Sequence, residues 1–305
     1  MVTRGRRAGY RLLGPRFDYL LHTRPVEWPI LAAHTLTGYL LAVGVQGAIA
    51  GQGIGRVMLG VALWVIALNG GTLALNSAYD QDEGDIAYLR QPPPPPRYLA
   101  LFGFGLMMTG GGAALLLPRG YVVAYWICLV LSVLYSVPPF RLKAVPGLDW
   151  IINMWGFGTL TPYAGWATTG LPVGPSGRLI LLGFCPLFAA LYPLTQIYQV
   201  EEDARRGDRT LTIFLGVRRS LMLALAGVIA AFGLFAAAGT RAGWRSNESW
   251  RWLVLALAAL GWALVLVPWL WQHRRMVTRQ HQHGMYRALL SWALTDLAVV
   301  LAWAT

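Results

Sequence analysis

The chain has 305 residues, of which 56% are hydrophobic and only 12% are charged, and its mean hydropathy is +0.50. This composition is typical of integral membrane proteins and excludes a chain built from ordinary soluble domains. The net charge of +12 does not indicate nucleic-acid binding, because the basic residues form short clusters between apolar runs. We expect no nucleic-acid partner. Anionic membrane lipids or a phosphorylated substrate suit these clusters better.

The N-terminal stretch is rich in arginine and lacks the apolar core that a signal peptide needs. We interpret residues 1–26 as a basic cytoplasmic arm and residues 1–305 as one transmembrane domain. The only two cysteines, Cys128 and Cys185, each lie inside an apolar run. A disulfide framework is therefore not expected.

Apolar runs of about 20 residues, long enough to cross hydrocarbon, recur along the chain. They predict an all-α membrane protein with nine transmembrane helices, near 28–50, 56–78, 98–117, 121–138, 149–169, 178–199, 218–239, 250–271 and 287–304. Most of the 25 Lys and Arg residues fall in the arm and in the connections on its side of the membrane. The positive-inside rule therefore places the N-terminus in the cytoplasm. We expect the membrane to be a bacterial or archaeal plasma membrane.

Two acidic stretches follow apolar runs on the predicted cytoplasmic side. The first is residues 76–85 (Asn-Ser-Ala-Tyr-Asp-Gln-Asp-Glu-Gly-Asp), and the second is residues 199–209 (Gln-Val-Glu-Glu-Asp-Ala-Arg-Arg-Gly-Asp-Arg). They hold most of the 13 acidic residues of the chain. An ordinary solvated loop is the alternative, but clustered carboxylates at membrane helices usually mark ion or substrate sites. Because Mg²⁺ takes carboxylate oxygens together with substrate phosphate oxygens, two facing half-sites predict a Mg²⁺ and diphosphate site.

Within each stretch an amide and an aspartate lie one helical turn apart on the same face. A glycine stands directly before the last aspartate and lets the backbone leave the helix, so we expect that aspartate to supply a third ligand. If the first helix continued instead, Glu83 would be better placed, because its position stays near the face of the amide. The predicted metal ligands are Asn76, Asp80, Asp85, Gln199, Asp203 and Asp208.

Between the two acidic stretches lies a predicted cytoplasmic loop that carries Tyr135, Arg141 and Lys143. Arginine offers a planar fork and lysine a point charge to phosphate oxygens. The alternative is that these cations only anchor the protein at the headgroup layer, and the same alternative holds for Arg209. We predict that Arg141, Lys143, Tyr135 and Arg209 bind the diphosphate, and that Asp80, Asp203, Tyr135 and Lys143 act in catalysis.

Taken in this order, the motifs resemble those of the UbiA superfamily of intramembrane prenyltransferases. Asn76 and Asp80 match the first two places of its Asn-x-x-x-Asp-x-x-x-Asp motif, whose third place holds Gly84 here. Gln199 stands where the second motif usually opens with Asp. The resemblance also covers the segments 135–143 (Tyr-Ser-Val-Pro-Pro-Phe-Arg-Leu-Lys), 209–216 (Arg-Thr-Leu-Thr-Ile-Phe-Leu-Gly) and 24–28 (Arg-Pro-Val-Glu-Trp).

The resemblance implies nine helices around a central apolar cavity, in which Mg²⁺ holds a prenyl diphosphate. It further implies ionisation of that substrate and transfer of the prenyl group to a lipophilic acceptor, such as an aromatic ring. A UbiA-type terpene cyclase, in which the substrate's own double bond captures the cation, is one alternative. A cation transporter is another, although transporters place such carboxylates at the membrane midplane and not at helix ends.

Two further sets of residues carry weaker signals. His281 and His283 are predicted in a cytoplasmic loop, and His-x-His without a third ligand is a weak metal motif. Four tryptophans lie deep in the predicted spans, where core packing is favoured over lining an isoprenoid cavity; they are Trp64, Trp126, Trp155 and Trp292.

Overall fold

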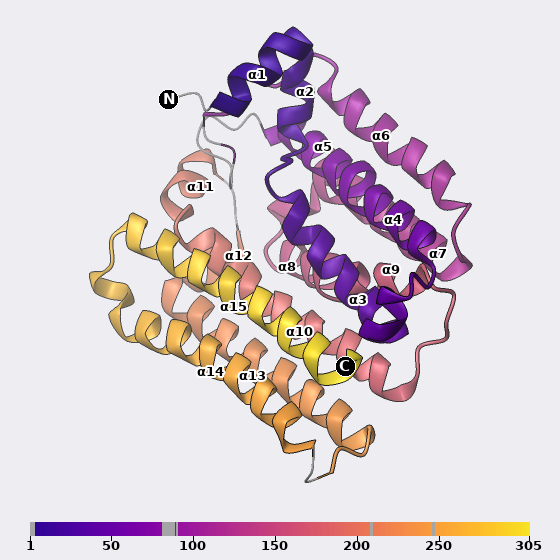
Figure 1. Cartoon of the computed structure of the whole chain (residues 1–305). Helices are drawn as coiled ribbons and strands as arrows, with labels where there is room; N and C mark the ends of the chain where they lie inside the picture. Colours follow the sequence, from indigo (N-terminus) through magenta and orange to yellow (C-terminus); the bar gives the residue numbers. More distant parts are fainter. Residues whose placement is uncertain (1–3, 81–88, 90, 208–209, 246–247) are drawn as a thin grey trace.

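The computed structural model describes residues 4–80, 89, 91–207, 210–245 and 248–305, and within these residues it contains helices and no β-strand (Figure 1). The α-helices are α1 (Arg4–Leu13), α2 (Phe17–His22), α3 (Trp28–Ile49), α4 (Ile54–Ala62), α5 (Gly70–Asp80), α6 (Leu99–Ala114), α7 (Arg119–Ser136), α8 (Leu148–Asn153), α9 (Thr161–Ala167), α10 (Pro175–Ile197), α11 (Val200–Arg206), α12 (Leu211–Leu215), α13 (Val217–Arg241), α14 (Ser249–Gln272) and α15 (Thr278–Ala304). Short 3₁₀ turns are η1 (Gly14–Arg16), η3 (Leu142–Ala144) and η6 (His273–Arg275). Two π-helical segments, η2 (Leu63–Asn69) and η4 (Met154–Leu160), continue directly into α5 and α9.

Seven helices in the described part of the chain are long and apolar enough to cross a membrane: Trp28–Ile49, Ile54–Asp80, Arg119–Ser136, Pro175–Ile197, Val217–Arg241, Ser249–Arg275 and Thr278–Ala304. The other two predicted spans correspond to shorter elements. One is α6, with 16 residues, and the other is divided among α8, η4 and α9. An all-helical integral membrane protein is thus confirmed, whereas a count of nine membrane-crossing helices stays a prediction.

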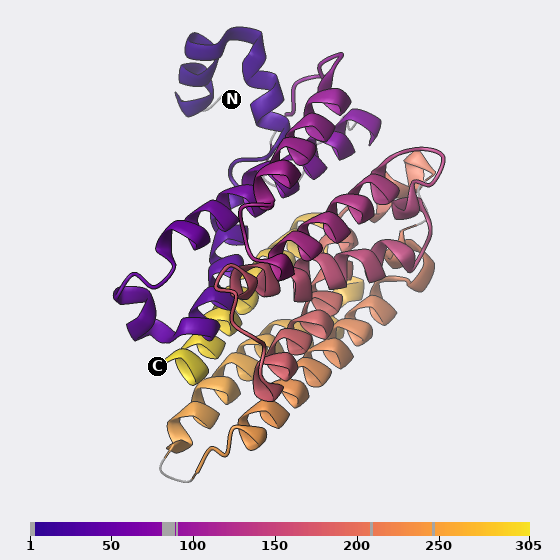
Figure 2. The same ribbon diagram turned by 90° about the vertical axis from the view of Figure 1, so that its right-hand side faces the viewer.

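The helices pack into two groups that lie side by side (Figures 1 and 2). In one group α10, α13, α14 and α15 enclose a core that contains Phe184, Phe235 and Trp262. In the other group α3, η2, α6, α7 and α9 enclose Met107 and Tyr121. The groups meet where α15 packs on α3 and α10 packs on η4. Such helices are apolar around most of their surface, because they face a core on one side and lipid on the other.

Both π-helical segments face the space between the two groups. A π-helical turn makes i to i+5 hydrogen bonds and commonly marks a functional site. Residues of both segments, among them Asn69 and Phe157, line the cavity described below. These local departures from α-helix therefore lie at the position where the fold is hollow.

The segment Pro92–Pro96 is not helical, as a run of prolines requires. The arm contacts its start, because an Arg6 guanidinium nitrogen donates to the Gln91 carbonyl oxygen at 2.9 Å. The loop predicted around His281 and His283 is wrong, since both lie inside α15. The helix begins early because the Gln280 side chain accepts the Val277 N–H at 2.9 Å and caps the first turn.

Candidate functional site

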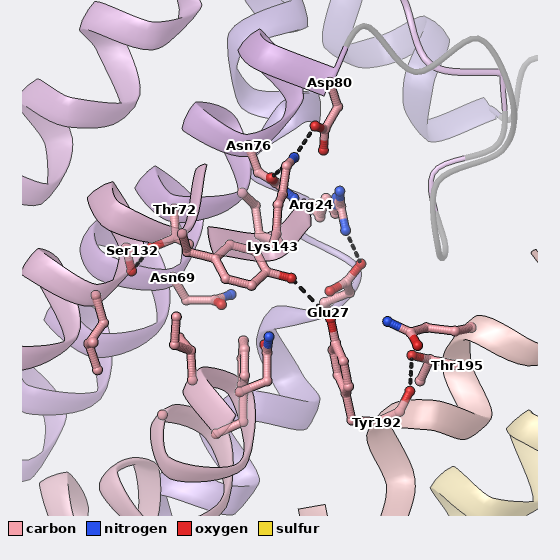
Figure 3. Close-up of a pocket in the computed structure, with 18 of the residues that line it drawn as sticks. Arg24, Glu27, Asn69, Thr72, Asn76, Asp80, Ser132, Lys143, Tyr192 and Thr195 are labelled. Atoms are coloured by element: carbon pink, nitrogen blue, oxygen red, sulfur yellow. Dashed lines mark hydrogen bonds and ion pairs between the residues drawn. The ribbon is translucent and has the colours of Figure 1, made fainter. Parts of the chain in front are cut away.

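A cavity of about 1130 Å³ lies between the two helix groups and opens at the end where α5 and α10 terminate (Figure 3). Near the mouth it is lined by charged and amide side chains. Deeper in the membrane region it is lined mainly by apolar and neutral polar residues, among them Leu31, Leu68, Trp64, Leu131 and Phe157. The predicted site residues within the described chain all line this cavity; they are Asn76, Asp80, Tyr135, Arg141, Lys143, Gln199 and Asp203.

The first acidic motif converges on a single ammonium group. Lys143 Nζ donates to Asn76 Oδ1 at 2.6 Å and also to Asp80 Oδ1 (Figure 3). Arg141 Nη2 lies 3.4 Å from the same Asp80 oxygen, and the Ser136 hydroxyl lies 3.5 Å from Asn76 Oδ1. The Asp80 carboxylate is only 17% exposed. Two oxygens one helical turn apart thus point at one positive charge, as the spacing predicted.

The second acidic motif lies at the other side of the mouth. Gln199 is the N-cap of α11, and the Asp203 N–H donates to the Gln199 carbonyl at 2.9 Å, so the two residues are one turn apart. Asp203 is 5% exposed. Gly207 has a φ of 77° and ends the helix, which is the turn that the sequence predicted before the last aspartate. Asp208 and Arg209 lie outside the described residues, and so do Asp85 and its alternative Glu83.

Two arginines at the mouth have left-handed backbone conformations. Arg24 has a φ of 52° and Arg141 a φ of 35°, values that side chains other than glycine rarely adopt. Strained backbone of this kind is held by surrounding structure and gathers at functional sites. Both residues line the cavity, so the two turns place positive charge at its mouth.

Arg24 and Glu27 were not predicted as site residues. Arg24 Nη1 lies 3.8 Å from Glu27 Oε1 (Figure 3). Burial raises the pKa of Glu27, and Arg24 opposes that shift. Burial also raises the pKa of Tyr198 to about 12, with Tyr286, Glu27 and Asp203 acting in the same direction. Tyr198 therefore stays a neutral phenol near Glu27 and Asp203, where it is able to donate a hydrogen bond.

A buried hydrogen-bond network holds the loop of Lys143 against α10. Asp149 is fully buried and accepts from the Gly147 N–H at 2.9 Å and from Gln196 Nε2 at 3.0 Å. Gln196 Oε1 accepts in turn from the Thr212 N–H at 3.2 Å. This network connects the loop, α10 and α12, so it sets the position of the phosphate-binding candidates relative to the second motif.

Tyr135 lies in the cavity wall. Its hydroxyl is 3.1 Å from the Tyr192 hydroxyl of α10. A role as hydrogen-bond donor to a diphosphate stays a prediction.

The tryptophans considered for these two roles differ in their surroundings. Trp64 lines the cavity and is also buried at 2% exposure, with its Nε1 donating to Thr161 Oγ1 at 3.2 Å. Trp292 packs in the core of the first helix group. Trp155 is 40% exposed and belongs to neither role.

The oxygen donors at the mouth fit a hard cation such as Mg²⁺. The Lys143 ammonium, which contacts Asn76 Oδ1 and Asp80 Oδ1 together, shows that these oxygens converge on a point charge. Within the described residues no group of three or more His, Cys, Asp or Glu side chains is arranged to hold a metal. Among the described residues each half-site offers one amide and one carboxylate, to which substrate oxygens would be added, as in other Mg²⁺ sites for phosphorylated substrates.

A sequence model of the UbiA prenyltransferase family matches residues 31–292. Because this match spans most of the chain, the protein belongs to the UbiA prenyltransferase family. Its all-helical fold, membrane-crossing helices and carboxylate-bearing cavity agree with this assignment. It is an integral membrane protein of the prenyltransferase type.

Curated relatives and solved structures add detail. A lycopene elongase/hydratase of Haloferax volcanii is 28% identical over 240 residues, which cover 76% of each chain. A UbiA homologue of Archaeoglobus fulgidus bound to geranyl diphosphate and Mg²⁺ superposes with a TM-score of 0.64 at 19% identity, covering 93% of this chain and 99% of that one. A digeranylgeranylglyceryl phosphate synthase superposes with a TM-score of 0.67 at 15% identity over 94% and 98% of the chains. At these identities the structures are similar to this chain in fold.

Proposed function

We propose that this protein is a Mg²⁺-dependent prenyltransferase that ionises a prenyl diphosphate at the cavity mouth and transfers the prenyl group to a lipophilic acceptor. The observation that carries this proposal is the convergence of Asn76 and Asp80 on Lys143 at the opening of a cavity that is apolar further in. The solved homologue with geranyl diphosphate and Mg²⁺ supports the same chemistry.

Each group has a defined task in this proposal. Asn76 and Asp80 form one metal half-site, with Asp85 as the third ligand, and Gln199, Asp203 and Asp208 form the other. Lys143, Arg141 and Arg209 bind diphosphate oxygens, and Tyr135 donates a hydrogen bond. Bound Mg²⁺ would neutralise charge on the leaving diphosphate. The apolar wall keeps bulk water from the allylic cation.

The apolar lining of the cavity restricts which acceptors can bind in it. Its deep wall has no charged side chain among the described lining residues, so an uncharged acceptor with an electron-rich double bond or ring fits. The curated relatives named lycopene elongase/hydratase favour a polyene hydrocarbon, and the resemblance to the family as a whole also favours an aromatic ring. We propose that catalysis faces the cytoplasm of a bacterial or archaeal plasma membrane.

The test is diphosphate release from geranyl diphosphate by the purified protein in lipid nanodiscs that also contain lycopene or an aromatic acceptor. Asp80→Asn and Asp203→Asn should each abolish release, and EDTA should stop it until Mg²⁺ is added. Asp18→Asn is the matched control, because Asp18 is an acidic residue of the arm that bonds to the Tyr10 hydroxyl at 2.6 Å and does not line the cavity. Normal release by Asp80→Asn would contradict the metal assignment.

Product analysis separates transfer from cyclisation. In a reaction without acceptor, a cyclase would release diphosphate and form a cyclic hydrocarbon, whereas a transferase would need lycopene or an aromatic acceptor for product formation. A cyclic product would replace the transfer proposal with the terpene cyclase alternative.

A further inference from the structure

Asp149 is a buried carboxyl group to which the proposed prenyl transfer has so far given no chemical task. It is fully buried and lies in the first turn of α8, behind the cavity lining. Within the described part of the chain, no ion pair joins it to a cation. A carboxylate away from water is costly unless other groups compensate its charge. Ionisable residues inside membrane proteins therefore usually serve a function.

Hydrogen-bond donors surround the Asp149 carboxyl group. The Gly147 N–H donates to Oδ1 at 2.9 Å, Gln196 Nε2 donates to Oδ2 at 3.0 Å, and the Tyr192 side chain forms a further hydrogen bond. The Gln196 amide has a fixed orientation, because its Oε1 accepts from the Thr212 N–H at 3.2 Å. Gly147 and Gln196 are able only to donate here. Tyr192 is therefore the one partner among these three that is able to exchange a proton with Asp149.

Two phenols connect Asp149 with the cavity. The Tyr192 hydroxyl is 3.1 Å from the Tyr135 hydroxyl, and both residues line the cavity. Figure 3 shows the Tyr192 side chain pointing into it. An ionised carboxylate only accepts, so the Tyr192 proton points to Asp149 and the Tyr135 proton points to Tyr192. The Tyr135 oxygen is thus the end of this chain of hydrogen bonds that lies at the cavity.

The same chain of hydrogen bonds is complete when Asp149 is protonated. Its O–H then donates to Tyr192, the Tyr192 O–H donates to Tyr135, and the Tyr135 O–H points into the cavity. The bonds from Gly147 and Gln196 persist in both arrangements, because Asp149 keeps acceptor capacity when it is protonated. Connected hydroxyls of this kind strengthen one another in a medium of low dielectric constant. Asp149 is therefore able to gain and lose a proton without losing a hydrogen-bond partner.

We propose that Asp149 accepts, through Tyr192 and Tyr135, the proton that prenyl transfer releases. The inference rests on the proposed function. The C–O bond to the diphosphate breaks and its electron pair leaves with the diphosphate. An acceptor double bond then forms a C–C bond to the prenyl carbon, which leaves the positive charge on an acceptor carbon.

The proton transfer removes that positive charge. A C–H bond beside the charged acceptor carbon breaks, its electron pair forms the new double bond, and its proton passes to the Tyr135 oxygen. The Tyr135 proton passes to Tyr192, and the Tyr192 proton passes to Asp149. The acceptor cation and the Asp149 carboxylate thereby neutralise each other, and both phenols end the step neutral. Before the step, a negative charge held by fixed donors near the cavity stabilises the developing cation.

The released diphosphate is the competing base, because it carries negative charge at the cavity mouth. The Tyr135 hydroxyl has one proton, which it is able to donate either to the diphosphate or to Tyr192. In the proposed sequence it donates to the diphosphate during ionisation and turns to Tyr192 once the diphosphate has left. Asp149 returns its proton along the same route to water at the open mouth after the product leaves.

The first test is a single turnover of geranyl diphosphate with lycopene in nanodiscs, in which the terminal methyl groups of lycopene carry deuterium. Attack by a terminal double bond leaves the charge on the carbon that bears these methyl groups. Tyr192→Phe removes one hydroxyl and keeps the Gly147 and Gln196 bonds to Asp149. It should slow product formation relative to diphosphate release by about 100-fold or more, as loss of a general base does. Deuterated lycopene should then react more slowly than unlabelled lycopene, an isotope effect that a merely structural defect does not produce.

Tyr125→Phe is the matched control. Tyr125 is a buried phenol of the same helix as Tyr135, its hydroxyl donates to the Met107 carbonyl at 3.0 Å, and it does not line the cavity. Its replacement should leave the ratio of product formation to diphosphate release unaltered and produce no isotope effect.

The second test is infrared spectroscopy during turnover of protein labelled with ¹³C-aspartate. The carbonyl band of a protonated aspartate should appear in the wild type and be lost in Tyr192→Phe. Its absence in the wild type, or its persistence in Tyr192→Phe, would overturn Asp149 as the acceptor. Wild-type product formation without an isotope effect in Tyr192→Phe would assign the proton to the diphosphate, and a product that keeps every deuterium would exclude the proposed C–H cleavage. Absence of diphosphate release by the wild type with acceptor present would overturn the proposed function, and this inference with it.

Discussion

Lys143 is the only lysine of the chain, and all other cationic side chains are arginine. At the cavity mouth its ammonium sits between the Asn76 and Asp80 oxygens, a space that suits a compact point charge better than a planar guanidinium. Its flexible stem also allows the ammonium to move from Asp80 to a phosphate oxygen. If the proposed function holds, Lys143 would exchange its Asp80 partner for a phosphate oxygen when substrate enters.

We predict that Lys143→Ala mainly raises the KM for the prenyl diphosphate. A hydrogen bond to a charged group contributes about 1.5–3 kcal/mol, which corresponds to about a 10- to 100-fold rise. Steady-state kinetics of diphosphate release measure this effect, and loss of uniform binding leaves kcat less affected. Arg178→Ala, which removes an exposed charge outside the cavity lining, should leave KM unaltered. An unchanged KM in Lys143→Ala would assign Lys143 to headgroup anchoring.

Residue spacing in the sequence predicted the part of this site that depends only on local helix geometry. The interval of four between Asn76 and Asp80 fixes a shared helical face, whatever the tertiary fold. Asn69 and Thr72 extend the same face and carry the same signal, which a search for polar residues within the span would have found. Arg24 and Glu27 are different. Their place beside Tyr198 depends on how the turn before α3 packs on the end of α10, and no local pattern encodes that contact.

At the scale of elements, the crossing of α3 and α9 is unusually close. A Cβ on Gly38 would overlap the Pro162 carbonyl oxygen, and one on Gly165 would overlap the Thr35 carbonyl oxygen. Glycine in membrane helices permits such backbone approach and the packing that follows from it. Because α9 continues from η4, this crossing also positions the wall of the cavity.

We predict that Gly38→Ala lowers the thermal stability of the detergent-solubilised protein. Overpacking of a close interface typically lowers the free energy of unfolding by about 1–3 kcal/mol. Here the added Cβ would meet the Pro162 backbone, which cannot move aside by changing rotamer as a side chain can. Gly112→Ala is the matched control, since a Cβ at that helical position meets nothing within 4 Å. Equal melting temperatures for Gly38→Ala and the wild type would contradict the close crossing.

The same region contains a buried pair that joins three elements. His34 Nδ1 of α3 is 2.9 Å from Asp296 Oδ1 of α15, and its Nε2 is 3.1 Å from the Phe157 carbonyl of η4. Apolar run length predicted α3 and α15 as helices because run length is a local property. The π-helical form of η4 was not predictable from the sequence. The Phe157 carbonyl is bonded by a side chain from another helix, and a side chain inserted in this way can change the hydrogen-bond pattern within the helix.

At the scale of the whole molecule, the arginine clusters and the cavity mouth lie at the same end of the helix bundle. Figure 1 shows α1, α11 and the turn between α14 and α15 at the end of the bundle that holds the acidic motifs, with the C-terminus at the opposite end. Clusters of arginine lie in these same segments, at Arg4–Arg16, Arg205–Arg219 and Arg274–Arg287. We therefore expect a diphosphate substrate to enter at the end of the bundle that carries this positive charge. By the positive-inside rule, the same arginines would orient the protein in the membrane.

We predict that the cavity mouth faces the cytoplasm, and cysteine labelling in intact cells tests this orientation. In a Cys128→Ala, Cys185→Ala background, Ala242→Cys should react with a membrane-impermeant maleimide, because Ala242 is exposed between α13 and α14 at the end opposite the mouth. Pro94 is the exposed proline of the segment near the arm, so Pro94→Cys should react only after the membrane is permeabilised. Both native cysteines are buried, so their removal changes no exposed surface. The reverse pattern, with Pro94→Cys labelled in intact cells and Ala242→Cys protected, would place the mouth outside and would require an extracellular source of prenyl diphosphate.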